Sequence, residues 1–281
     1  MAEMNLYRKR ELQNNAQEYF SKAEKIFSDF RIKESREGKK IDTKVLEIAF
    51  KLIDKGLEIW INNKDAYNLK GCIYITLGKT EEAEEALRKA IEIDPNFYSA
   101  RYNLALCHLA KGNEKEAQKE LVELIHLKKD YFMAINTLGN IYQKKEEYNT
   151  AKKLFERVIN MHEYYIPSYI GKANCEEKEG NLEEALKTIK TAIKKFPDYK
   201  NKYSVEGYAL KNSGEEEFDF GRKYFEENIH NYPELISLYY KKSIIELKLG
   251  KETAAKKSME KIKSTLVFRK IDEKNLADIE K

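Results

Sequence analysis

The sequence predicts an all-α protein, an α-solenoid of stacked antiparallel helix pairs. Small residues recur at intervals of 34 residues, and a second series of small residues follows nearly the same interval. Proline and glycine are scarce, at 4 and 12 of 281 residues, which favours long helices joined by short turns over sandwiches or barrels. We therefore expect each interval to form one helical hairpin whose apolar side is buried by its neighbours.

Four series of positions carry the repeat. The first helix of each pair has a small residue, in turn Gly71, Ala105, Gly139, Ala173, Gly207 and Ser243. The second helix has a small residue and, four places later, a large apolar one: Ala83 with Leu87, Ala117 with Leu121, Ala151 with Phe155, Ala185 with Ile189, Gly221 with Phe225, and Ala255 with Met259. Between the helices stand Gly78, Gly112, Glu146, Gly180, Gly214 and Gly250. A small residue lets another helix approach closely, the large residue fills the gap between the paired helices, and glycine ends the first helix.

This pattern resembles the tetratricopeptide repeat. The clearest match is the stretch 64–97, where the family's characteristic positions are held by Tyr67, Gly71, Tyr74, Ala83, Leu87, Ala90 and Pro95. The resemblance extends over six tandem repeats, residues 64–97, 98–131, 132–165, 166–199, 200–235 and 236–269. It weakens at Lys70, Glu176 and Glu246, and the fifth repeat is two residues longer than the others. The resemblance implies a right-handed superhelix.

Two flanking segments are expected to cap the array. Residues 1–63 read as an N-terminal helical pair, a degenerate or capping repeat, with Asp42 as the N-cap of its second helix. Residues 270–281 read as a polar C-terminal capping helix. Within the array, Pro95, Pro197 and Pro233 are expected to close three of the repeats.

The charge balance argues against nucleic acid as the partner. The chain has 52 basic and 48 acidic residues, whereas a nucleic-acid binder more often shows a concentrated basic stripe. Residues 236–281 are the most basic part, with 12 Lys or Arg against 7 Asp or Glu. Nucleic-acid binding through this C-terminal end is therefore kept as an alternative function.

The sequence offers little for catalysis. The histidines His108, His126, His162 and His230 have no catalytic partner at helical spacing, and the cysteines Cys72, Cys107 and Cys175 form no metal knuckle. Carboxylates gather at turns and helix starts, where they favour the helix dipole. We expect a protein that is not an enzyme and that has no cofactor or metal; a helical subunit of an enzyme complex is the other alternative.

The sequence has features that are typical of a cytoplasmic protein. The opening residues lack the apolar core of a signal peptide, and no stretch has the apolar length needed to span a bilayer. An odd number of widely spaced cysteines fits a reducing compartment. We therefore expect a cytoplasmic protein without a membrane partner.

The resemblance implies that the first helix of each repeat lines a concave binding groove. The candidate groove residues are Asn136, Asn140, Gln143, Lys144, Asn174, Lys178, Tyr208, Lys211 and Asn212. Asn140 and Asn174 are one repeat apart and offer a donor and an acceptor each to the main chain of an extended peptide. Lys144 and Lys178, also one repeat apart, would favour acidic side chains or a free carboxylate.

These residues define the function expected from the sequence. We predict a non-enzymatic scaffold that binds a protein or peptide segment in the groove, with acidic groups favoured. The first helices depart from the family's basic clamp for chaperone C-termini, so no chaperone partner is predicted. The partner's identity and the oligomeric state stay open.

Overall fold

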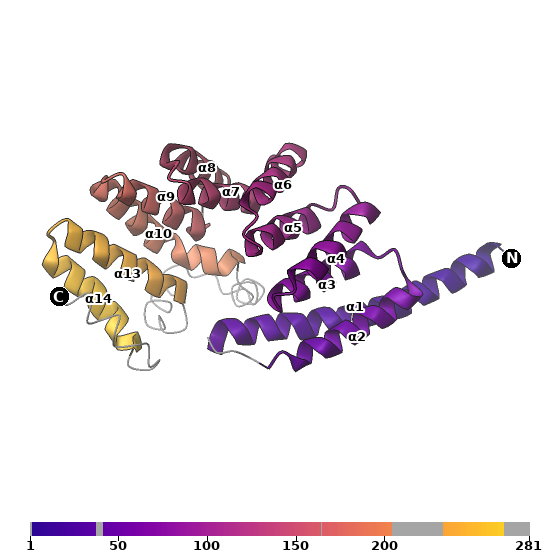
Figure 1. The fold of residues 1–281 in the computed structure, drawn as a ribbon. Helices are drawn as coiled ribbons and strands as arrows, with labels where there is room; N and C mark the ends of the chain where they lie inside the picture. Colours follow the sequence, from indigo (N-terminus) through magenta and orange to yellow (C-terminus); the bar gives the residue numbers. More distant parts are fainter. Residues whose placement is uncertain (1, 38–41, 164, 204–232, 267–281) are drawn as a thin grey trace. The chain divides into compact units, whose positions relative to one another are not determined.

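The structure, a computed structural model, describes residues 2–37, 42–163, 165–203 and 233–266, and these residues form helices and turns without any strand. The chain divides into two compact units, residues 1–134 and 135–281. The first unit holds α1 (Ala2–Glu37), α2 (Lys44–Ile59), α3 (Lys64–Thr76), α4 (Thr80–Ile93), α5 (Tyr98–Ala110) and α6 (Glu114–Leu127). The second holds most of α7 (Phe132–Lys144), then α8 (Tyr148–Met161), α9 (Ile166–Lys178), α10 (Leu182–Tyr203), α13 (Pro233–Lys248) and α14 (Glu252–Leu266) (Figure 1). The prediction of an all-α array of helix pairs is confirmed.

In the hairpins from α3 onward that the structure describes, the turn between the paired helices contains one residue in the left-handed conformation. The backbone φ is positive at Gly78, Gly112, Gly180 and Gly250, and it is 62° at Glu146, which fills the one gap in the glycine series. The next amide bonds back to a carbonyl five residues earlier, as from Glu147 N to Tyr142 O at 2.9 Å. This pattern is the Schellman motif, which satisfies carbonyls left open at a helix end.

Glu146→Gly should stabilise the protein. A non-glycine residue in the left-handed region costs on the order of 1 kcal/mol, and part of this strain is relieved by glycine. We expect a gain of about 0.5 kcal/mol and a higher melting temperature by circular dichroism. The matched control is Gly112→Glu at the equivalent turn, which should lower the melting temperature. A fall with both variants would contradict this account of the turn.

The contact between helices rests on a large side chain held against glycine. Phe155 of α8 is fully buried. A Cβ atom added at Gly139 of α7 would lie 2.7 Å from its ring, and one added at Gly171 of α9 would lie 2.4 Å from it. In the first unit, Leu87 of α4 similarly fills the space at Gly71 of α3. The predicted packing of a large side chain against a small residue is confirmed for Gly71 with Leu87 and for Gly139 with Phe155, and Gly171 adds a second glycine that the series did not include.

Gly171→Ala should destabilise the second unit although alanine favours a helix by about 1 kcal/mol. The Cε1 and Cζ atoms of Phe155 that the new methyl group would meet also lie close to Gly139, which leaves the buried ring little room to move, and overpacking typically costs about 1–3 kcal/mol. We expect the denaturant midpoint to fall in the wild-type background. In a Phe155→Leu background the same change should no longer lower it, as a double-mutant cycle would measure. Equal losses in both backgrounds would show that the ring and Gly171 do not compete for space.

The N-terminal pair packs by the same rule. Phe20 of α1 lies against Gly56 of α2, where an added Cβ would come within 2.3 Å of its ring. The second helix of this pair, α2, begins at Lys44, with Thr43 as the N-cap residue. The predicted cap, Asp42, lies one residue earlier and accepts the Lys44 amide at 3.0 Å. Most of the outward-facing residues of α1 between Asn14 and Asp29 are polar or charged and exposed, as expected for a terminal pair.

In the second unit, the hairpin of α13 and α14 packs against α9 and α10. One apolar cluster joins Ile166 and Tyr169 of α9, Ile189 of α10, and Leu235 and Leu238 of α13. The helix α10 continues past residue 197 to Tyr203, so Pro197 does not end it; the helix passes through the proline with one fewer backbone hydrogen bond. Most of the predicted 200–235 repeat and all of the 270–281 capping helix lie outside the described residues. The division into six repeats with two capping segments stays a prediction.

Candidate functional site

The candidate site lies on what we call the first-helix face. It is the side of α7, α9 and α13 that points away from their paired helices α8, α10 and α14. Asn140 and Lys144 of α7 and Lys178 of α9 are exposed on it, and Gln143 and Asn174 are half-buried. Asn140 follows directly after Gly139, which packs against the Phe155 ring inside the hairpin. The side chain of Asn140 is therefore held outward.

One predicted member of the site belongs to the interior instead. Asn136 is 7% exposed, and its side-chain oxygen accepts a hydrogen bond from the Ser168 hydroxyl at 2.7 Å. This bond joins α7 to α9. Asn136 is therefore a contact between neighbouring hairpins rather than an open groove residue, because it lies one turn before Asn140 on the side that meets α9. The other predicted members, Tyr208, Lys211 and Asn212, lie outside the described residues.

An ionic cluster crosses from α9 to α13. Glu177 of α9 is 11% exposed, and its two carboxylate oxygens bind separate lysines of α13. Lys248 lies 2.6 Å from one oxygen, and Lys241 forms an ion pair with the other. Burial acts to raise the pKa of Glu177, but the hydrogen bonds from the two lysines outweigh it, and the pKa lies below its ordinary value. This pairing has no local signal in the sequence, because the two lysines are 64 and 71 residues away from Glu177.

Two buried carboxylates, Glu176 and Glu246, occupy the position that Tyr74 and Tyr142 hold in two other hairpins. Glu176 of α9 accepts from the Thr188 hydroxyl of α10 at 2.8 Å and pairs with Lys172 at 3.0 Å. In the last hairpin, Glu246 accepts from Ser258 at 2.8 Å and pairs with Lys242 at 3.2 Å. Each member of the second set lies 70 residues after its counterpart in the first. That recurrence of Lys, Glu and a hydroxyl residue was the signal in the sequence that could have revealed the cluster.

Thr188→Val should destabilise the second unit by about 1–3 kcal/mol, because it leaves one oxygen of the buried Glu176 carboxylate without its donor. The measurement is the denaturant midpoint. The control is Thr191→Val on the same helix, where the hydroxyl is exposed and bonds only to the carbonyl of Lys187. A loss no larger than that of the control would mean that Thr188 is not needed by Glu176.

The corresponding face of the first unit is less charged. Asn103 of α5 donates to the Asn68 oxygen at 2.8 Å and to the Cys72 sulfur at 3.2 Å, both on α3. Burial raises the pKa of the Cys72 thiol to about 11, so the thiolate that would act as a nucleophile is disfavoured. Burial likewise raises the pKa of Cys175 to about 11. These thiols fit structural positions.

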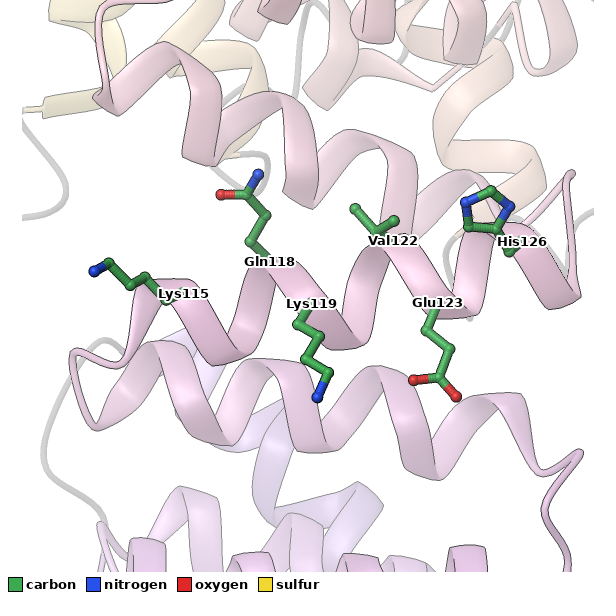
Figure 2. Close-up of a pocket in the computed structure, with 6 residues that line it drawn as sticks. All are labelled: Lys115, Gln118, Lys119, Val122, Glu123 and His126. Carbon is green, nitrogen blue, oxygen red and sulfur yellow. The ribbon is translucent and has the colours of Figure 1, made fainter.

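The surface depressions lie along single helices. One runs along α6, and Figure 2 shows its six residues as a row on that helix: Lys115, Gln118, Lys119, Val122, Glu123 and His126. Another runs along α10 from Glu183 to Lys194. Neither brings acids or nucleophiles together from different elements, as an enclosed catalytic site would. Among the described residues, no group of three or more His, Cys, Asp or Glu could hold a metal ion.

Membrane insertion finds no support in the helices of the described part of the chain. Even the longest of them, α1 and α10, are too polar to cross a bilayer. The cytoplasmic location expected from the sequence stays a prediction.

Comparison with known proteins identifies repeats along the chain. Family models described as tetratricopeptide repeat match residues 64–97, 86–119 and 133–163. No match was found among curated proteins.

Solved structures share the fold. PilW, a type IV pilus biogenesis factor, is 14% identical with a TM-score of 0.62, and the match covers 90% of this chain and 94% of PilW. TTC0263, a thermophilic repeat protein of Thermus thermophilus, is 15% identical with a TM-score of 0.52, covering 70% of this chain and 97% of that one. YrrB, described as a repeat protein of this kind with an unusual peptide-binding site, is 15% identical with a TM-score of 0.50, covering 82% and 98%. At these identities the likeness is one of fold.

Proposed function

The chain is a tetratricopeptide repeat protein, and we propose that it is a non-enzymatic scaffold whose first-helix face binds an extended segment of a protein partner. The repeat fold supports a role in protein interaction. The observation that carries the finer proposal is the outward placement of Asn140, Lys144 and Lys178 on consecutive first helices, with Asn174 half-buried beside them. A cytoplasmic location belongs to the same proposal.

The two asparagines suit the main chain of a bound segment. A side-chain amide can donate to a carbonyl and accept from an amide, so Asn140 and Asn174 can each hold one peptide unit of an extended chain. Lys144 and Lys178 follow one turn later and supply positive charge along the same direction. This arrangement favours a segment with acidic side chains or a free carboxylate. YrrB, with its described peptide-binding site, is in keeping with this use of the fold.

Nucleic-acid binding through the C-terminal end gains no support from α13 and the start of α14. Four of their lysines are engaged with carboxylates of this chain: Lys241 and Lys248 with Glu177, Lys242 with Glu246, and Lys251 with Glu183. Half of the eight lysines between residues 233 and 266 are therefore held by carboxylates of this chain. We retain the protein partner as the proposal.

The proposal is tested with peptides selected from a displayed random library by the full-length protein. Replacing both Asn140 and Asn174 by Ala should weaken the selected peptides about tenfold in fluorescence polarisation, because two hydrogen-bonding side chains are lost. Replacing Lys144 and Lys178 by Glu should weaken acidic peptides most strongly at low salt. Melting temperatures should stay near that of the wild type.

A matched control uses two exposed asparagines of α8. Asn149→Ala with Asn160→Ala makes the same chemical change on the second helix of a hairpin, away from the first-helix face. Selected peptides should bind this variant as they bind the wild type. If peptides lose affinity with the control and keep it with the Asn140 and Asn174 variant, the binding face is the opposite one.

A further inference from the structure

The strongest unassigned feature of the described surface lies on α13, where an apolar stripe runs beside two lysines. Tyr240 is 40% exposed and Leu247 is 39% exposed, and Ile244 between them is half-buried. The three are spaced by four and three residues, so they share one side of the helix. Lys241 and Lys248 each follow directly after a member of this stripe.

Among the described residues next to the stripe, positive charges outnumber negative ones. Lys241 and Lys248 both converge on Glu177, so two positive charges share one carboxylate. Lys248 remains 51% exposed while it makes this contact. The next residue of α9, Lys178, is also exposed and adds positive charge to the region. A carboxylate from a partner can therefore bind here. It can either join the contact of Glu177 with the two lysines or take over one of these lysines from Glu177.

We propose that this junction is a binding site for a partner segment that combines acidic and apolar side chains, and that Glu177 is its internal competitor. The proposal rests on the proposed function and names the chemistry of the segment. Apolar side chains of the partner cover Tyr240, Ile244 and Leu247, and a carboxylate of the partner binds Lys248 and Lys241.

If Glu177 competes with the partner for the two lysines, removing its charge should tighten the binding of an acidic partner segment. Glu177→Gln keeps the size of the side chain and one acceptor but removes the charge that shares the lysines. A purely structural ion pair would behave in the opposite way, because its loss would loosen the contact between α9 and α13. The sign of the change in affinity therefore separates the two roles.

The experiment uses the full chain and a fluorescein-labelled hexapeptide, Glu-Leu-Glu-Glu-Leu-Glu, in fluorescence polarisation. Glu177→Gln should tighten binding roughly fivefold, in the range expected for one partly exposed ion pair. Replacing Lys241 and Lys248 by Gln, or Tyr240 and Leu247 by Ser, should weaken it at least as much. Peptides with Gln in place of Glu, or Ser in place of Leu, should bind more weakly than the parent peptide.

The matched control is Glu183→Gln. It makes the same chemical change in the adjacent helix α10, where Glu183 forms a more exposed pair with Lys251 at 2.7 Å. It should leave the affinity unchanged. Melting temperatures of all variants, followed by circular dichroism, report whether the hairpin still folds. Unchanged or weaker binding by Glu177→Gln with an intact melting curve would overturn the competitor role, and a lower melting temperature with lost binding would make Glu177 a structural latch.

Other outcomes separate this inference from the proposed function. If the hexapeptide does not bind the wild type or Glu177→Gln, while library peptides still depend on Asn140 and Asn174, the inference fails and the proposed function stands. If the hexapeptide behaves as expected but is insensitive to those asparagines, the junction stands without them. A dimer by light scattering that dissociates with Leu247→Ser would show that a second copy of the chain covers the stripe, which overturns the inference.

Discussion

The second unit depends on the packing of one large side chain, Phe155, directly against glycines of the neighbouring helices. Phe155 is fully buried, and its ring packs close to a glycine of α7 and a glycine of α9, so one ring joins α7, α8 and α9. A ring enclosed in this way permits little sliding of one helix along another, because interiors are closely packed. The first-helix face inherits its order from this contact: Asn140 lies next to one of the two glycines, and Asn174 lies three residues after the other.

The buried polar contacts have a different role from the packing of Phe155 against glycine. Glu176 and Glu246 stand where two other repeats carry Tyr74 and Tyr142, and each is satisfied by a hydroxyl of the paired helix and a lysine of its own helix. Burying a carboxylate costs free energy unless it is paired and hydrogen-bonded. Each of these carboxylates therefore favours the one arrangement of helices that supplies its partners. Glu177, one residue along, meets lysines of the next hairpin instead. Adjacent residues of α9 thus serve the inside of one hairpin and the junction with another.

The repeat could be predicted wherever a physical requirement recurs. A small residue facing a large one, and a left-handed residue in each turn, are needed in every hairpin, so Gly139, Phe155 and Glu146 could be assigned from spacing alone. Contacts between hairpins are not set by that spacing. Asn136 and Asn140 are one turn apart on the same helix, yet one is buried against Ser168 and the other is exposed. Glu177 gives no local sign of its lysines, since they come from a helix far along the chain.

The Schellman turns close each hairpin with hydrogen bonds between residues only five apart in the sequence. The contacts that bury Leu87 and Phe155 against the preceding helix span only 16 residues. Contacts this local lose little entropy when they close, which favours rapid formation of each of these hairpins. During synthesis, each hairpin can form soon after it leaves the ribosome, with the preceding hairpin as its template. The order of the repeats along the chain is then also the order in which the binding face is assembled.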